Sequence, residues 1–107
     1  LIVLTPTVRW FVDNLTGGDA ARAAAPALSP LLGDVSAFPP ALLLCGTADP
    51  LLDDTLLMAA ALARAGVAAE TRLWPGGVHA FDQFDDLPIA REAQAARAGF
   101  LSRLAAG

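Results

Sequence analysis

Residues 41–79 read ALLLCGTADPLLDDTLLMAAALARAGVAAETRLWPGGVH, and their pattern decides the fold. The apolar run at residues 41–45 lies between two prolines and Gly46, which is typical of a strand covered on both faces of a parallel sheet. Residues 67–74 predict a second strand, which Pro75 ends. A helical pattern separates the two, so the stretch predicts a strand–helix–strand unit with parallel strands.

The intervening helix is predicted over residues 52–65. Asp53 and Asp54 lie in its first turn, where negative charge is favourable, and Gly66 is a suitable stop. The face predicted to pack on the sheet consists of Leu52, Leu56, Ala59, Ala60 and Ala63.

Outward from this unit, we expect a short strand at residues 1–4 and a short amphipathic helix at residues 8–15, closed by two glycines. Residues 19–40 contain four prolines, so we expect no long regular element there. A final helix is predicted over residues 88–104, with Pro88 at its start and an apolar stripe of Ile89, Ala93, Ala96, Phe100 and Leu104. The alternation predicts an α/β fold with about three parallel strands and flanking helices, and residues 1–107 as one partial domain.

Two polar residues follow the predicted strands. Asp49 comes just after the strand at residues 41–45, and His79 comes just after the strand at residues 67–74. Neighbouring parallel strands present their carboxyl ends at the same edge of the sheet, so the two side chains are expected to meet there. An aspartate that accepts a hydrogen bond from one imidazole nitrogen leaves the other nitrogen free to take a proton from a nucleophile.

Each residue also has a purely structural interpretation, which the sequence leaves open. Asp49-Pro50 is a good N-cap followed by a proline at the first helical position, and a histidine in a glycine-containing loop is often only packed or solvated. The tryptophans are more typical of structural positions, although Trp10 could border a pocket. The acids at positions 82, 85 and 86 resemble a solvated loop that Phe81 and Phe84 pack down.

The amino-acid composition favours some classes of binding partner and argues against others. With glycine included, roughly 63% of the residues are apolar, against about 45–50% in ordinary globular proteins. This excess predicts a surface meant for a partner, either the remainder of a larger fold or a second copy of the chain. The net charge is −4 and there is no lysine, which argues against nucleic acid. No apolar run approaches the roughly 20 residues of a membrane span.

The content of histidine and cysteine is equally restrictive. One histidine without a nearby cysteine or second histidine offers no ligand cluster, so we expect neither a metal nor another cofactor. Cys45 is predicted to be a small buried hydrophobe. A chain that cannot form an internal disulfide is compatible with a cytoplasmic location, which we take as the expectation.

Several short motifs follow one another across about residues 28–84: LSPL at residues 28–31, FPPALLL at 38–44, GTADPL at 46–51 with Asp53, AGV at 65–67, WPGG at 74–77 and HAF at 79–81. In their order and spacing they resemble the C-terminal part of the α/β-hydrolase esterases related to hormone-sensitive lipase. The resemblance implies the last three strands of the family's sheet, Asp49 as the triad acid and His79 as the general base. It also implies that the region of Trp10 lies near the substrate entrance.

The chain departs from the family in two ways. Ala80 stands where the family commonly has glycine, which bears on the geometry of the histidine loop. The family's Gly-x-Ser-x-Gly nucleophile turn and His-Gly-Gly-Gly oxyanion loop do not occur in the 107 residues. None of Ser29, Ser36 and Ser102 has such a setting.

The leading hypothesis is therefore the C-terminal portion of a serine carboxylesterase or lipase-like enzyme that hydrolyses small-molecule esters. Since triad members act as a unit, we expect the isolated chain to be inactive. One alternative is a fragment of a peptidase or dienelactone-type hydrolase, which the proline context disfavours. Another is a non-catalytic truncated module that self-associates, for instance through the unpaired strand at residues 1–4.

Overall fold

The structure is a computed structural model that describes residues 5–107. The elements in chain order are α1 (Thr5–Thr16), α2 (Ala20–Ala23), the 3-10 turn η1 (Pro30–Leu32), β1 (Ala41–Gly46), α3 (Leu52–Arg64), β2 (Ala69–Trp74), the 3-10 turn η2 (Phe81–Gln83) and α4 (Pro88–Ala106). The expected strand at residues 1–4 lies outside the described residues. The other predicted elements are confirmed, with ends that differ by up to three residues from the predicted ones.

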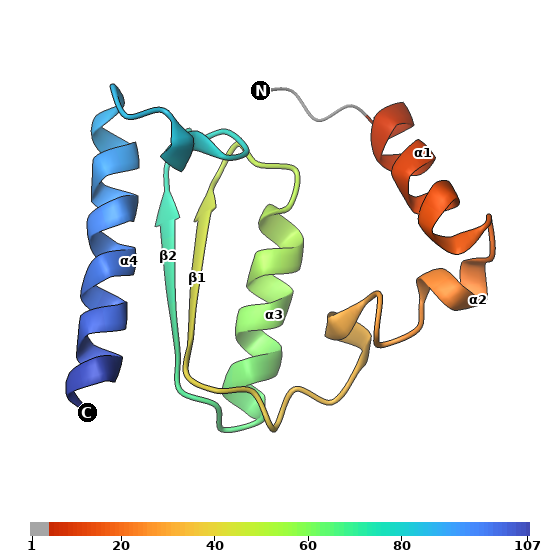
Figure 1. The fold of residues 1–107 in the computed structure, drawn as a ribbon, viewed down its shortest axis with the longest axis horizontal. Coiled ribbons are helices and arrows are strands. Elements are labelled where there is room, and N and C mark those ends of the chain that lie inside the picture. The colour runs from red at the N-terminus through yellow and green to blue at the C-terminus, as the bar shows by residue number, and fades with distance from the viewer. Residues whose placement is uncertain (1–4) are drawn as a thin grey trace.

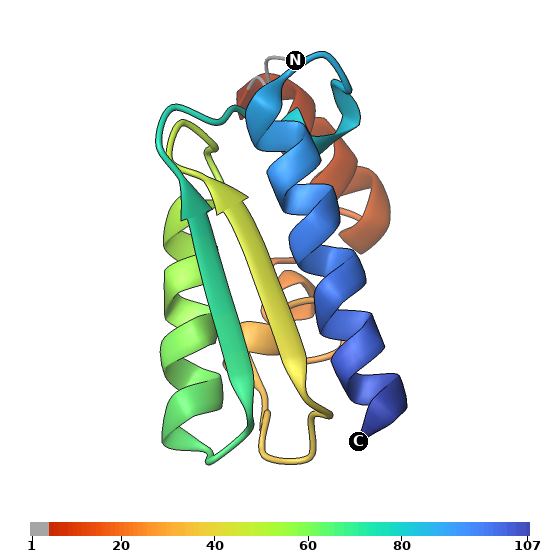
Figure 2. The ribbon, with the colours of Figure 1, turned by 90° about the vertical axis from the view of Figure 1, so that its left-hand side faces the viewer.

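The two strands form a parallel sheet with α3 as the connection between them. The register runs from Ala41 opposite Ala69 to Gly46 opposite Trp74. Figure 1 shows the sheet edge-on, with α3 on one face and α4 on the other, and Figure 2 shows both strands pointing the same way. The prediction of an α/β fold with a parallel sheet is confirmed, and both carboxyl ends lie at one edge.

Gly66 ends α3 as predicted. Its φ is +75°, a left-handed conformation that glycine adopts without steric cost. The amide of Gly66 donates to Ala63 O at 3.1 Å, and the amide of Val67 donates to Leu62 O at 3.0 Å. These two bonds form a Schellman motif, which satisfies carbonyls at the helix end and turns the chain towards β2.

The face of α3 that packs on the sheet was predicted only in part. Leu62 is 1% exposed and is the most deeply buried leucine among residues 5–107, whereas Leu56 is 43% exposed and Ala63 is also exposed. Leu52, Ala59 and Ala60 are half-buried, as expected. From Leu56 to Ala63 this helix has leucine, methionine or alanine at every position, so its hydrophobic period does not distinguish one face from the next there.

The core on the opposite face of the sheet joins β2 to α4. Trp74, Phe81 and Ala93 are buried together, and Leu44, Ile89 and Ala96 pack against them. The indole nitrogen of Trp74 donates to a carboxylate oxygen of Glu92 at 2.9 Å, which satisfies its only polar atom. The predicted stripe of α4 is confirmed except at Leu104, which is exposed.

A large apolar surface remains uncovered. The radius of gyration is 15.6 Å, against roughly 13 Å for a compact domain of this length. Helices α1 and α2 stand apart from the sheet, beyond α3 (Figure 1). Trp10 and Phe11 of α1 are 60% and 61% exposed and contact each other edge to face at 5.1 Å between ring centroids. Among residues 5–107, no helix has the length and apolarity to cross a membrane.

Candidate active site at the carboxyl edge of the sheet

Two glycines let the loops after β1 and β2 come into backbone contact. A Cβ built on Gly46 would lie 2.0 Å from the carbonyl oxygen of Gly77, closer than any real contact. Gly77 is also constrained, because its Cβ would lie 3.0 Å from Gly46 Cα and 3.1 Å from the Phe81 ring. Only glycine fits at Gly46 with this approach, which brings the two loops to one place.

Hydrogen bonds then fasten the loops to each other. The amide of Thr47 donates to Trp74 O at 3.0 Å, and the amide of Ala48 donates to Gly77 O at 3.0 Å. In the reverse direction, the amide of Gly76 donates to the hydroxyl of Thr47 at 2.8 Å. The strand register of β1 and β2 is thereby extended past the last residue of each strand.

Asp49 and His79 meet at the end of this paired segment. Nδ1 of His79 lies 3.1 Å from one carboxylate oxygen of Asp49 and 3.2 Å from the other. The Asp49 side chain is 10% exposed and the His79 side chain is 32% exposed. The structure thus brings together the two residues that the sequence placed at the ends of neighbouring strands.

The local structure around Asp49 immobilises its carboxylate. The amide of Leu51 donates at 2.8 Å to Oδ1 of Asp49, the carboxylate oxygen that lies 3.2 Å from Nδ1 of His79. The amide of Leu52 donates to the Asp49 carbonyl at 3.1 Å. The N-cap of α3 is Leu51, so the interpretation of Asp49-Pro50 as the helix cap itself is wrong. Asp49 instead forms a turn one step before the helix, and that turn leaves its carboxylate facing the histidine.

This arrangement can support general base chemistry. A carboxylate only accepts hydrogen bonds, so Nδ1 of His79 is the donor and Nε2 of the neutral ring is the acceptor. The ring is partly exposed, so a second group can approach it. A nucleophile placed there could pass its proton to the ring, while Asp49 would stabilise the positive charge that forms.

The residue after the histidine is strained. Ala80 has φ 57° and ψ 29°, a left-handed conformation that is uncommon for residues with a Cβ. It begins the η2 turn, in which Phe81 is buried against Trp74 with ring centroids 5.5 Å apart. Ala80 is the position where the resembled family has glycine, and this backbone conformation is a physical reason for glycine there.

Helix α4 is bonded to the histidine loop, which is the segment at residues 75–87 between β2 and α4. The side-chain amide of Gln94 donates to Asp82 O and to a carboxylate oxygen of Asp85, both at 2.9 Å. Arg97 forms an ion pair with Asp82, and Arg91 donates to Asp85 O at 2.9 Å. Asp85 and Asp86 are exposed, as predicted for a solvated loop, whereas Asp82 is half-buried and paired with Arg97.

The packing of that loop by aromatic side chains was predicted correctly for Phe81, which is 4% exposed, but not for Phe84, which is 45% exposed. Sequence reasoning missed Thr47 and Gln94 as contacts of the site. Thr47 had a weak signal, since it lies directly between the strand and Asp49. Gln94 had none, because its partners are 9 and 12 residues away along the chain.

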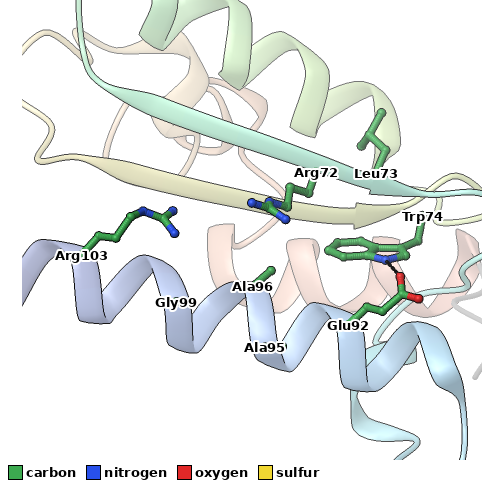
Figure 3. A pocket seen from close by; sticks show the side chains of 8 residues that line it. All are labelled: Arg72, Leu73, Trp74, Glu92, Ala95, Ala96, Gly99 and Arg103. Atoms are coloured by element: carbon green, nitrogen blue, oxygen red, sulfur yellow. Dashed lines mark hydrogen bonds between the residues drawn. The ribbon is translucent and has the colours of Figure 1, made fainter.

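A groove of about 740 Å³ lies away from the Asp49–His79 pair, between β2 and α4. Its lining includes Arg72, Trp74, Glu92 and Arg103, and Figure 3 shows the Trp74–Glu92 hydrogen bond at one end. Neither Asp49 nor His79 lines it. We take the edge of the sheet as the candidate site, because a hydrogen-bonded acid and base are chemically competent and a groove with exposed arginines has no such pair.

Other candidate residues have structural surroundings. Cys45 is buried at 4% exposure, as predicted. Within residues 5–107, no three histidine, cysteine, aspartate or glutamate side chains gather as potential metal ligands. Asp53 and Asp54 lie in the first turn of α3, as expected of charges that favour a helix start.

Comparison with known proteins identifies the family. Residues 1–83, which include both Asp49 and His79, match the family described as alpha/beta hydrolase fold. The chain belongs to the α/β-hydrolase fold family. An ethyl acetate hydrolase of Pseudomonas putida is 40% identical to this member over 76 residues, which are 70% of this chain and 24% of that protein.

Solved structures of esterases agree with the assignment to the α/β-hydrolase fold. A hyperthermophilic esterase from the archaeon Pyrobaculum calidifontis superposes with a TM-score of 0.86 at 30% identity, over 100% of this chain and 35% of that one. The esterase EstE5, in crystals soaked with p-nitrophenyl butyrate, superposes with a TM-score of 0.89 at 23% identity, over 97% and 35%. The resemblance to α/β-hydrolase esterases is thus confirmed, and the chain spans about a quarter to a third of the length of these relatives.

Proposed function

We propose that this chain supplies the acid and the general base of a serine hydrolase that cleaves small-molecule carboxylic esters. The observation that carries the proposal is the contact of His79 Nδ1 with both carboxylate oxygens of Asp49, at 3.1 and 3.2 Å, past the ends of adjacent parallel strands. The names of the relatives, an ethyl acetate hydrolase and several esterases, support ester hydrolysis as the reaction class.

In the proposed reaction, a serine hydroxyl attacks the ester carbonyl carbon and its proton passes to Nε2 of His79. The protonated ring then gives that proton to the departing alcohol, which leaves an acyl-enzyme. Water then attacks the acyl carbon and loses a proton to His79, and the ring gives that proton to the serine oxygen as its bond to the acyl carbon breaks, which releases the carboxylic acid. Asp49 holds the ring in the Nδ1–H form throughout and stabilises its charge when it is protonated.

The serine belongs to a Gly-x-Ser-x-Gly turn that the 107 residues do not contain. We therefore propose that the chain acts as one partial domain of a larger hydrolase fold, paired with a segment that carries the nucleophile. The 107-residue chain alone is expected to show no turnover of a p-nitrophenyl ester. Turnover by the pure chain that disappears in His79→Ala would contradict this part of the proposal.

A chimera tests the catalytic roles directly. The matching third of the Pyrobaculum calidifontis esterase is replaced by this chain, which covers that region over its whole length. The folded chimera is expected to hydrolyse p-nitrophenyl esters, and His79→Ala and Asp49→Asn are each expected to lower kcat by about 10⁴-fold or more. Asp53→Asn, a change at a neighbouring acid in the first turn of α3, is the matched control and is expected to keep activity.

The outcome that would overturn the assignment is a chimera in which His79→Ala and Asp53→Asn have the same kcat. A folded chimera without turnover, beside an active parent, would also count against it. Circular dichroism and thermal melting of each protein establish that it is folded before kinetics are compared.

A second candidate function is a non-catalytic module that associates with itself. The exposed apolar side chains favour it, since Trp10, Phe11 and Leu32 are each 60% to 63% exposed. Light scattering over micromolar concentrations tests it, with a concentration-dependent dimer as the expected result and a monomer throughout as the contrary one. The cytoplasmic location remains a prediction from the lone buried cysteine, which cell fractionation would check.

A further inference from the structure

The side chain of Thr47, in the β1–α3 loop, contacts the loop that carries His79. Its hydroxyl accepts a hydrogen bond from the Gly76 amide at 2.8 Å, and its own amide donates to Trp74 O at 3.0 Å. Thr47 thus contacts both the last residue of β2 and the turn that follows it. Within residues 5–107, the only other side-chain hydrogen bond between these two loops is that of the Asp49–His79 pair itself.

The links between the two loops follow one another in chain order. Thr47 is bonded to Gly76, Ala48 to Gly77 and Asp49 to His79. The Ala48 link is made by main-chain atoms alone, and the Asp49 link is the reacting pair. A substitution at Thr47 can therefore remove one of these three links and leave the reacting groups and the backbone unchanged.

The turn at Gly76 is held by hydrogen bonds from two amides. Gly76 has φ +75°, and a Cβ built there would meet nothing within 4 Å. The amide of Gly77 donates to Trp74 O at 3.1 Å and closes the turn, and the bond from the Gly76 amide to the Thr47 hydroxyl is the side-chain contact that ties the turn to the β1–α3 loop. Rotation of the turn would be carried through Gly77 to His79, which lies three residues later.

We propose that Thr47 is a positioning residue, whose hydroxyl holds Gly76 so that Nδ1 of His79 faces the carboxylate of Asp49. The inference rests on the proposed function, which gives that pair its role. The hydroxyl of Thr47 is bonded to Gly76 and not to the imidazole, so Thr47 acts on His79 through the turn.

The test uses nuclear magnetic resonance of the 107-residue chain, in which His79 is the only histidine and its ring signals need no assignment. Thr47→Val removes the hydroxyl and keeps the shape of the side chain, whereas Thr47→Ser keeps the hydroxyl. Thr55→Val is the matched control, because it removes a threonine hydroxyl that also forms one hydrogen bond, here by donating to Leu51 O at 3.0 Å, and that bond does not involve the loop that carries His79.

Thr47→Val is expected to speed exchange of the Nδ1 proton and of the Gly76 amide on the order of fivefold, which is the factor for loss of one net hydrogen bond. The Nδ1 nitrogen signal should also move towards the average of the two ring tautomers. Because Thr47 is exposed, water replaces the lost acceptor in part and the effect stays modest. Thr47→Ser and Thr55→Val should leave the ring signals as in the wild type.

The proposal is overturned if Thr47→Val and Thr55→Val give the same ring signals, or if Thr47→Ser changes them as much as Thr47→Val does. If Thr47→Val does not fold, Thr47→Ser alone still decides, since the ring signals of that variant must match the wild type. These readings need no ester turnover, so a failure of the proposed hydrolase function would show separately in the chimera.

Discussion

Gly46→Ala tests the close backbone approach on which the candidate site depends. The added methyl group would lie 2.0 Å from the Gly77 carbonyl oxygen, and an ordinary contact begins at 3.4 Å. The obstructing atoms are backbone, so no side-chain rotation relieves the clash. The two loops must move apart, and the hydrogen bond from the Ala48 amide to Gly77 O, now 3.0 Å, cannot survive a separation of that size.

The expected loss of stability combines two effects. Overpacking that forces backbone shifts costs about 1–3 kcal/mol, and the lost hydrogen bond contributes about 1 kcal/mol more. A decrease of about 2–4 kcal/mol in the free energy of unfolding is comparable to the whole stability of many small domains. Urea denaturation followed by circular dichroism should show a midpoint lower by about 1 M or more.

Two other glycines serve as controls for the chemical change itself. Gly66 has φ +75° and open space around it, so Gly66→Ala should cost only the strain of a left-handed residue, about 1–2 kcal/mol. Gly99 lies inside α4, where the nearest atom is a flexible Arg103 nitrogen at 3.6 Å, so Gly99→Ala should stabilise by about 0.5–1 kcal/mol.

The His79 ring signals distinguish a local from a general effect. Gly46→Ala should release the Nδ1 proton to exchange, whereas Gly66→Ala and Gly99→Ala should retain the wild-type ring signals under conditions where each is folded. If Gly46→Ala is no less stable than Gly66→Ala and keeps those signals, the loops do not approach as described and the reasoning fails.

Three further predictions concern the loop and the surface. Ala80→Gly removes left-handed strain of about 1–2 kcal/mol and adds about 0.5–1 kcal/mol of unfolded-chain entropy, so a calorimetric melt should show a net gain below about 1.5 kcal/mol; a lower Tm would contradict it. Gln94→Leu removes two hydrogen bonds to the loop at residues 80–87, so amide exchange there should rise on the order of tenfold while exchange in β1 stays unchanged. Hydrogen bonds from the backbone and the side chain of Ser36, in that order of size, lower the pKa of Asp34 below 3.8. The stability that this carboxylate contributes should therefore be present above pH 3.8 and lost as the pH falls through the pKa of the folded state. A pKa of 3.8 or higher in an NMR titration of Asp34 would refute this prediction.

Much of the fold could be predicted from hydrophobic periodicity and from the prolines and glycines that end its strands and helices. The strand at residues 41–45 and the helix before Gly66 were predicted because prolines and glycines bound them sharply. The buried face of α3 was not, because leucine, methionine and alanine occupy every side of that helix from Leu56 to Ala63. Contacts between distant segments, such as those of Gln94, were likewise beyond a local pattern, since nothing near Gln94 in the chain indicates which loop it meets.

The candidate site shows the same division. The sequence by itself determined that Asp49 and His79 follow the two strands, because strand–helix–strand order brings parallel strands to one edge. It predicted that their side chains meet, but not the contacts that bring the two loops together. Those contacts are the approach of Gly46 to Gly77 and the hydrogen bond to the hydroxyl of Thr47, between residues about 30 positions apart. The hydrophobic periodicity of a segment indicates which of its sides faces a core. The hydrogen bonds between two loops, in contrast, form only when both segments are packed together.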